Sequence, residues 1–87
     1  MAYRPIFHKD VEKFLARQER AFVEAFSAKL RVLCEDPFAA PVDVKPMRGI
    51  KNHWRLRIGG FRFLYEIRKQ ELFLYFYKAG VRGDITS

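Results

Sequence analysis

The sequence has few of the residues and segments on which secreted, metal-binding and membrane proteins depend. Cys34 is the only cysteine among 87 residues, so no disulfide can form within the chain. One cysteine and two histidines provide no metal-ligand spacing, and we expect neither a metal nor a cofactor. The longest apolar run, residues 72–77, is far shorter than the ~20 residues of a membrane helix. No cationic and apolar leader opens the sequence, which indicates a cytoplasmic protein.

Acidic residues are scarce in the second half of the sequence. Residues 45–82 contain ten Lys or Arg but only two acidic residues, Glu66 and Glu71. Residues 1–44 contain seven of each sign, so the net charge of +7 comes from the second half. A basic surface on one side of a protein is typical of a partner that is rich in phosphates.

Apolar and aromatic residues are abundant, at 49% and 16% of the chain. A chain of 87 residues has room for one core, and we expect a single domain over residues 1–87. Residues 8–18 and 19–33 each carry apolar side chains at spacings of three and four, which predicts two helices with one buried side each. Residues 3–7 favour an edge strand because they include a proline, and residues 37–53 are predicted to be a loop.

Two runs of alternating apolar and polar residues flank Gly59-Gly60, which is a strong hairpin signal. A two-residue turn would place Ile58 opposite Phe61 and continue that register along both strands. One face of the hairpin would then be apolar and covered by the helices. The opposite face would carry three arginines together, namely Arg55, Arg57 and Arg62.

Residues 72–77 are apolar throughout and predict a third, central strand after a turn at Lys69-Gln70. If that turn also has two residues, Tyr77 lies beside Arg62, and Tyr75 lies beside Leu64. Phenol rings among guanidinium groups are typical of single-stranded RNA sites, although ordinary sheet packing explains the two tyrosines equally well. The sequence thus predicts an α+β fold, with two N-terminal helices on one face of a small, mainly antiparallel sheet of about four strands.

The run from Trp54 to Glu66, WRLRIGGFRFLYE, resembles the core of the RelE/ParE toxin superfamily. The preceding PMRGIKNHW resembles the family's approach to this strand, and KAGVRGDI resembles its closing Gly-x-Arg segment. The resemblance covers nearly the whole chain and implies a RelE-like fold. It also implies a small cytoplasmic toxin of a toxin–antitoxin pair, with a cognate antitoxin as a partner and no membrane.

The resemblance leaves three functions open. RelE-like members are endoribonucleases that cleave mRNA in the ribosomal A site, so that the ribosome and mRNA are partners. ParE-like members instead inhibit DNA gyrase without cutting anything. A third possibility is a member with weak or no nuclease activity that mainly binds its antitoxin.

Matched by position, four arginines fall where RelE-like members keep functional basic residues: Arg55, Arg57, Arg62 and Arg82. In RNA cleavage the 2′-OH attacks the adjacent phosphate, and fixed guanidinium groups stabilise the charge that develops on its oxygens. We assign Arg62 and Arg82 to this phosphate and the other two to the RNA backbone. The residues expected to contact RNA are Lys45, Arg48, Lys51, His53, Tyr75 and Tyr77.

The C-terminal segment departs from the family pattern. RelE-like members usually have a tyrosine a few residues after the closing arginine, where this sequence has Thr86. A threonine hydroxyl is a much poorer acid or base than a phenol. Three consequences remain open: catalysis is weak, Tyr77 or His53 takes over, or the nuclease activity has been lost.

Overall fold

The computed structural model of the chain describes residues 2–81. Its elements in chain order are β1 (Arg4–Phe7), α1 (Lys9–Ala16), α2 (Arg20–Glu35), β2 (Val44–Pro46), β3 (His53–Ile58), β4 (Phe61–Arg68) and β5 (Phe73–Val81). The strands form one sheet in the order β1-β5-β4-β3-β2, in which only the β1–β5 pair is parallel. The predicted α+β fold is confirmed, with one strand more than expected.

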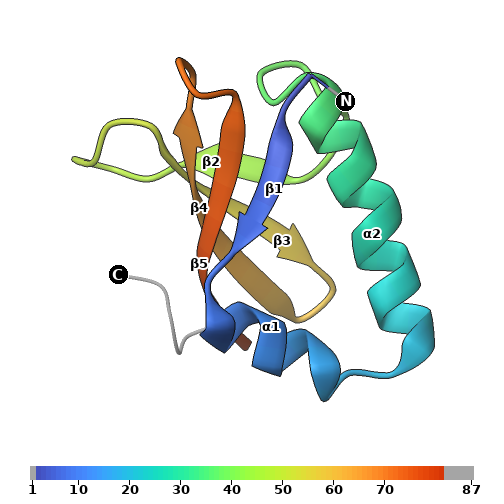
Figure 1. The fold of residues 1–87 in the computed structure, drawn as a ribbon. Helices are drawn as coiled ribbons and strands as arrows, with labels where there is room; N and C mark the ends of the chain where they lie inside the picture. The colour runs from blue at the N-terminus through green and yellow to red at the C-terminus, as the bar shows by residue number, and fades with distance from the viewer. Residues whose placement is uncertain (1, 82–87) are drawn as a thin grey trace.

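Both helices contribute to one apolar core against the sheet (Figure 1). Phe26 of α2 lies at its centre, with its ring centroid 4.6 Å from that of Phe63 and 6.2 Å from those of Phe7 and Phe76. These rings come from α2, β1, β4 and β5, so this aromatic cluster joins segments that are distant in the sequence. Within residues 2–81, the helices therefore cover one face of the sheet and leave the opposite face, here called the helix-free face, uncovered.

The helix ends follow from local sequence. The His8 side chain accepts a hydrogen bond from the backbone N–H of Asp10 at 3.0 Å and so caps α1. Asp10 and Glu12 lie in the first turn, where negative charge is favourable. Helix α2 ends at Glu35, directly before the Asp36-Pro37 pair, because a proline cannot continue a helix. Both helices lie within two residues of their predicted bounds.

The β3–β4 hairpin has the predicted register throughout. Ile58 pairs with Phe61, Arg57 with Arg62, and Trp54 with Tyr65. Gly59 has a φ of 58°, the left-handed region, whereas Gly60 does not have a positive φ. A positive φ at the first central residue alone is the geometry of a type II′ turn, which matches the twist of the flanking strands.

The segment predicted to be a loop, residues 37–53, contains the additional strand β2. Its three residues pair with β3, with Lys45 opposite Arg55 and Pro46 opposite Trp54. The prediction missed this strand because a run of three residues that ends in a proline gives no periodic signal. Proline is compatible with this position because β2 is an edge strand.

The predicted register between β4 and β5 is wrong. Arg68 pairs with Phe73, so the turn contains residues 69–72 instead of two residues. A β-bulge then shifts the register between Leu64 and Tyr65, which pair with Lys78 and Phe76 and leave Tyr77 as the extra residue. As a result Tyr75 lies opposite Glu66 and not Leu64, and Arg62 lies opposite Gly80 and not beside Tyr77.

Candidate nucleic-acid interface

Strand pairing gathers cations on the helix-free face. One row across the sheet contains Lys45, Arg55, Leu64 and Lys78, from β2, β3, β4 and β5. The next row, two residues along each strand, contains Arg57, Arg62 and Gly80. Neighbouring strands lie ~4.8 Å apart and such rows ~6.6 Å apart, which is the scale of a nucleotide backbone step. We call the five cations the basic band: Lys45, Arg55, Arg57, Arg62 and Lys78.

The members of the basic band differ in exposure. Lys45, Arg57 and Lys78 are exposed and Arg55 is partly buried, whereas Arg62 is only 5% exposed. Arg62 thus lies on the predicted face, but the expectation that it would be solvent-exposed is wrong. The physical reason is its place on β4, the middle strand, which has neighbours on both sides.

Arg57 is held by an acidic residue that sequence reasoning did not single out. Its Nε donates to Asp43 Oδ2 at 2.8 Å, and its backbone N–H donates to the Asp43 carbonyl oxygen at 2.9 Å. Both side chains are roughly half exposed, at 41% and 49%. An exposed ion pair contributes little to stability, so Asp43 mainly positions Arg57 and reduces the charge that it presents.

Arg55 has an unsatisfied donor. Its Nε is buried and has no hydrogen-bond partner among residues 2–81. A buried donor without a partner costs roughly 1–3 kcal/mol, and an acceptor that bound beside it would remove that cost. Of the basic band, Arg55 therefore has the clearest structural reason to bind an anion.

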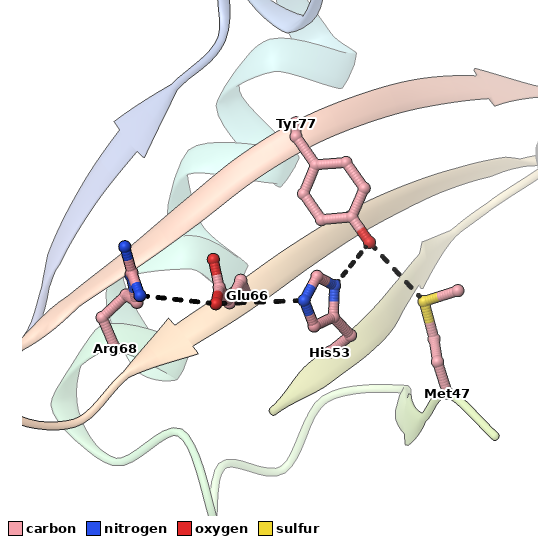
Figure 2. Close-up of polar contacts among 5 residues, drawn as sticks. All are labelled: Met47, His53, Glu66, Arg68 and Tyr77. Carbon is pink, nitrogen blue, oxygen red and sulfur yellow. Dashed lines mark hydrogen bonds and ion pairs between the residues drawn. The ribbon is translucent and has the colours of Figure 1, made fainter. Parts of the chain in front are cut away.

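A chain of polar contacts borders the basic band at the other end of β3 (Figure 2). His53 Nδ1 lies 2.9 Å from the hydroxyl of Tyr77, and His53 Nε2 lies 3.9 Å from Glu66 Oε2. The Tyr77 hydroxyl also donates to Met47 Sδ at 3.8 Å, and Glu66 Oε2 lies 3.7 Å from Arg68 Nη1. His53 and Glu66 are directly opposite each other in the β3–β4 pair, and the bulge brings Tyr77 to them from β5.

The Tyr77 phenol is held in its protonated form. Its partial burial, and secondarily the negative charge of Glu66, raise the pKa of Tyr77 above its ordinary value. The Glu66 carboxylate also favours a proton on the nearer ring nitrogen of His53, Nε2. In the neutral ring Nδ1 is then an acceptor for the Tyr77 hydroxyl, and in the charged ring it is a donor to it.

The comparisons with known proteins concern the sequence and the fold. No protein-family model matches the sequence. A protein of Escherichia coli described as a RelE-like toxin is 29% identical over 84 residues, covering 94% of this chain and 85% of that protein. A chain in the crystal structure of the archaeal RelE–RelB complex from Pyrococcus horikoshii OT3 is 26% identical, with a TM-score of 0.83, covering 97% of this chain and 99% of that one.

The chain is therefore similar to RelE-like toxins in both sequence and fold. The isolated RelE toxin of Escherichia coli has the same fold, with a TM-score of 0.78 at 18% identity, covering 97% of this chain and 90% of that chain. The resemblance inferred from residues 54–66 and their flanks is therefore confirmed.

The other residues expected at the site lie in different places. Arg48 and Lys51 are exposed in the loop between β2 and β3, which extends from the sheet on the side opposite α2 (Figure 1). This loop adjoins the His53 end of the sheet, away from the hairpin end that holds Arg57 and Arg62. Tyr75 is partly buried, with its ring centroid 6.2 Å from that of Tyr77. Arg82 and Thr86 lie outside the described residues.

Three residues of this face were not among the predicted site residues: Asp43, Glu66 and Lys78. The position of Glu66 follows from the hairpin register, because one further step from the Trp54–Tyr65 pair places it opposite His53. Lys78 could not be placed on this face without the bulge. Asp43 precedes a strand that the sequence did not reveal.

Residues 2–81 contain neither a metal-ligand cluster nor a helix able to span a membrane. Within residues 2–81, no three His, Cys, Asp or Glu side chains are grouped so that they could hold a metal ion. No helix in the same part of the chain has the length and apolar character needed to cross a membrane.

Proposed function

We propose that this chain is the toxin of a toxin–antitoxin pair and that it cleaves mRNA on the ribosome. The observation that supports this proposal most directly is the basic band, whose five cations lie in two adjacent rows of one sheet face. Arg57 and Arg62 lie directly opposite each other on this face, and an RNA backbone would bind several of these cations at once.

The proposed reaction is the attack of a 2′-OH on the adjacent phosphate. Negative charge accumulates on the non-bridging oxygens as the O2′–P bond forms and the P–O5′ bond breaks. Arg55, with its buried unsatisfied Nε, is assigned to this phosphate together with Arg62 and Arg82. Lys45, Arg57 and Lys78 are assigned to the flanking backbone.

The remaining RNA-binding assignments extend this surface along the sheet. Arg48 and Lys51 would bind phosphates beyond the His53 end of β3, and Tyr75 would stack on a base. His53 and Tyr77 would lie between the two groups of cations.

A cognate antitoxin is the second proposed partner. The archaeal relative was crystallised as a RelE–RelB complex, which supports a protein partner of the same kind here. A segment that covers the basic band or displaces RNA from it would neutralise the toxin. The predicted gyrase alternative receives no support from the relatives described above, whose names refer to RelE.

A member that only binds its antitoxin is the remaining alternative, and two observations favour it. Arg57 is bound by Asp43, and Arg62 is buried. Together they reduce the charge that the basic band presents to RNA.

Translation of a defined message in vitro with the purified chain, followed by mapping of new 5′ ends, separates these functions. Codon-phased cuts that require ribosomes are expected from the unaltered chain. Arg55→Ala should slow them by ~100-fold, because the loss of one donor aimed at a developing oxyanion typically has that effect. Arg31→Ala is the matched control, since Arg31 is exposed on α2 and away from this face.

The other outcomes are equally informative. An intact message with normal translation would leave antitoxin binding as the function. An intact message combined with inhibited DNA supercoiling would support the gyrase alternative. Equal activity of Arg55→Ala and Arg31→Ala would remove Arg55 from the site.

A further inference from the structure

The proposed cleavage has a requirement that the basic band does not meet. The departing 5′ oxygen is a strongly basic alkoxide, so its departure is assisted by a proton donor. Arginine is a poor donor because its pKa lies far above neutral pH and the guanidinium keeps its proton. The side chains around Tyr77 on the helix-free face have the geometry of such a donor.

Tyr77 is placed beside the basic band by its own strand. Tyr77 is the extra residue of the bulge. The next residue, Lys78, lies in the row of Arg55 and Lys45. Bulges re-aim a side chain away from the regular alternation of a strand and are frequent beside active sites. A phosphate held by Arg55 and Lys78 would therefore lie within a residue spacing or two of the Tyr77 hydroxyl.

The Tyr77 hydroxyl makes one short hydrogen bond, to His53, and one long and weak contact, to Met47. Its strong contact is with His53 Nδ1 at 2.9 Å, and when that nitrogen carries a hydrogen the phenol's own hydrogen is directed to Met47 Sδ at 3.8 Å. A thioether sulfur is a weak acceptor. An oxygen of a bound substrate would compete successfully for that hydrogen.

The imidazole behind Tyr77 can replace a proton that the phenol donates. His53 Nε2 faces the Glu66 carboxylate at 3.9 Å, and this contact orients the ring (Figure 2). In the charged ring Nδ1 carries a hydrogen directed at the Tyr77 oxygen. Arg68 lies 3.7 Å from the same carboxylate oxygen and limits its movement.

We propose that Tyr77 is the general acid of the cleavage step, with His53 and Glu66 as positioning residues that resupply its proton. This inference rests on the proposed ribonuclease function. The O2′–P bond forms and the P–O5′ bond breaks, while the phenol proton of Tyr77 passes to O5′. The Nδ1 proton of His53 passes to the Tyr77 oxygen, the O2′ proton leaves to water, and the imidazole is recharged from solvent.

Two observations support the acid role of Tyr77 over a role as a base. Burial and Glu66 raise the pKa of Tyr77, so the phenol carries its proton at neutral pH. His53 Nδ1 lies 2.9 Å from the phenol oxygen, which is close enough to return a proton to it after each donation. This arrangement would also perform the task for which Thr86 is chemically unsuited.

A message with sulfur in place of the 5′ bridging oxygen at the cleaved position tests the proposal. A thiolate leaves without a proton, so the substitution removes the need for a general acid. Single-turnover cleavage on programmed ribosomes is measured for the unaltered chain, Tyr77→Phe, His53→Gln and Glu66→Gln, with both messages. Arg55→Ala is the control variant, because its defect does not concern the leaving group.

Tyr77→Phe is expected to cleave the ordinary message ~100-fold more slowly than the unaltered chain, a typical contribution of general acid catalysis. On the sulfur message the two should agree within about threefold. His53→Gln and Glu66→Gln should slow cleavage of the ordinary message by a smaller factor, and their rates on the sulfur message should be normal. A variant with a damaged structure would instead be slow on both messages. Arg55→Ala should be slow with both messages.

Equal defects of Tyr77→Phe on the two messages, or no defect on the ordinary one, would overturn the assignment. Thermal unfolding of each variant identifies any that fails to fold, and for such a variant Tyr77→Trp replaces Tyr77→Phe. If the unaltered chain cleaves neither message, the proposed function itself fails and the general acid fails with it.

Discussion

Asp43 binds Arg57 through both its backbone and its side chain, at 2.9 Å and 2.8 Å. The contact reduces the positive charge at one end of the basic band, so its removal is expected to strengthen the binding of RNA.

Asp43→Asn should increase the affinity for single-stranded RNA several-fold at low salt. Release of Arg57 adds one cation that can contact a phosphate, and the slope of log K against log salt should steepen by ~0.7. Fluorescence anisotropy of a labelled oligonucleotide over a range of salt concentrations measures both quantities. Glu24→Gln on α2 changes the net charge equally, so an identical effect there would show that Arg57 is not responsible.

Gly59→Ala should destabilise the domain, whereas Gly60→Ala should have little effect. Neither glycine has a heavy atom within 4 Å of an added Cβ, so space does not distinguish them. Only Gly59 has a positive φ, of 58°, where an alanine costs ~1 kcal/mol. Urea unfolding of the two variants measures the difference, and equal midpoints would contradict the type II′ turn.

Tyr65→Phe should leave the free energy of unfolding unchanged or raise it by ~1 kcal/mol. Tyr65 is fully buried, and its hydroxyl has no hydrogen-bond partner among residues 2–81. Removal of a buried, unsatisfied hydroxyl removes its desolvation cost. Urea midpoints provide the comparison with Tyr3→Phe, at a partly buried position. A loss of more than ~1 kcal/mol would show that the hydroxyl has a partner in solution.

Cys34 should be unreactive in the folded protein. Burial raises the pKa of the Cys34 thiol from its ordinary value of 9.0 to about 11, and the side chain is 0% exposed. A disulfide reagent at pH 8 is expected to modify it at least ~100-fold more slowly in buffer than in urea. Comparable rates in the two solvents would show that α2 opens readily near its end.

The same thiol gives a pH dependence of stability with a definite sign. Because its folded-state pKa lies above the ordinary value, its contribution is complete below pH 9 and is lost as the pH rises toward 11. The unaltered chain should therefore lose stability relative to Cys34→Ala over that interval. A difference that stays constant with pH would contradict a buried, protonated thiol.

The sequence predicted the parts of this fold that depend on periodicity and on a short turn. The helices and the complete β3–β4 register followed from the apolar spacing and from Gly59-Gly60, so Arg55, Arg57 and Arg62 were correctly placed on one face. Both signals are local, and a two-residue turn permits only one register.

The rest of the site depended on features without a local signal. The turn before β5 has four residues and contains Leu72 with a φ of 60°, which no turn-forming residue type indicated. The bulge adds one residue to β5, and the two shifts together moved Tyr77 from the expected neighbourhood of Arg62 to His53. Strand β2, and the contact of the preceding Asp43 with Arg57, were equally hidden, because three residues are too few to show an alternation of apolar and polar side chains.

The parallel pairing of β1 with β5 has a consequence for synthesis of the protein. Residues 4–7 pair with residues 73–76, and the core includes side chains of both segments. On a translating ribosome β1 therefore remains unpaired until β5, the last strand of the sheet, has emerged. Pairing over such a long sequence separation is slow. The nascent chain consequently remains without its completed core during most of its own translation.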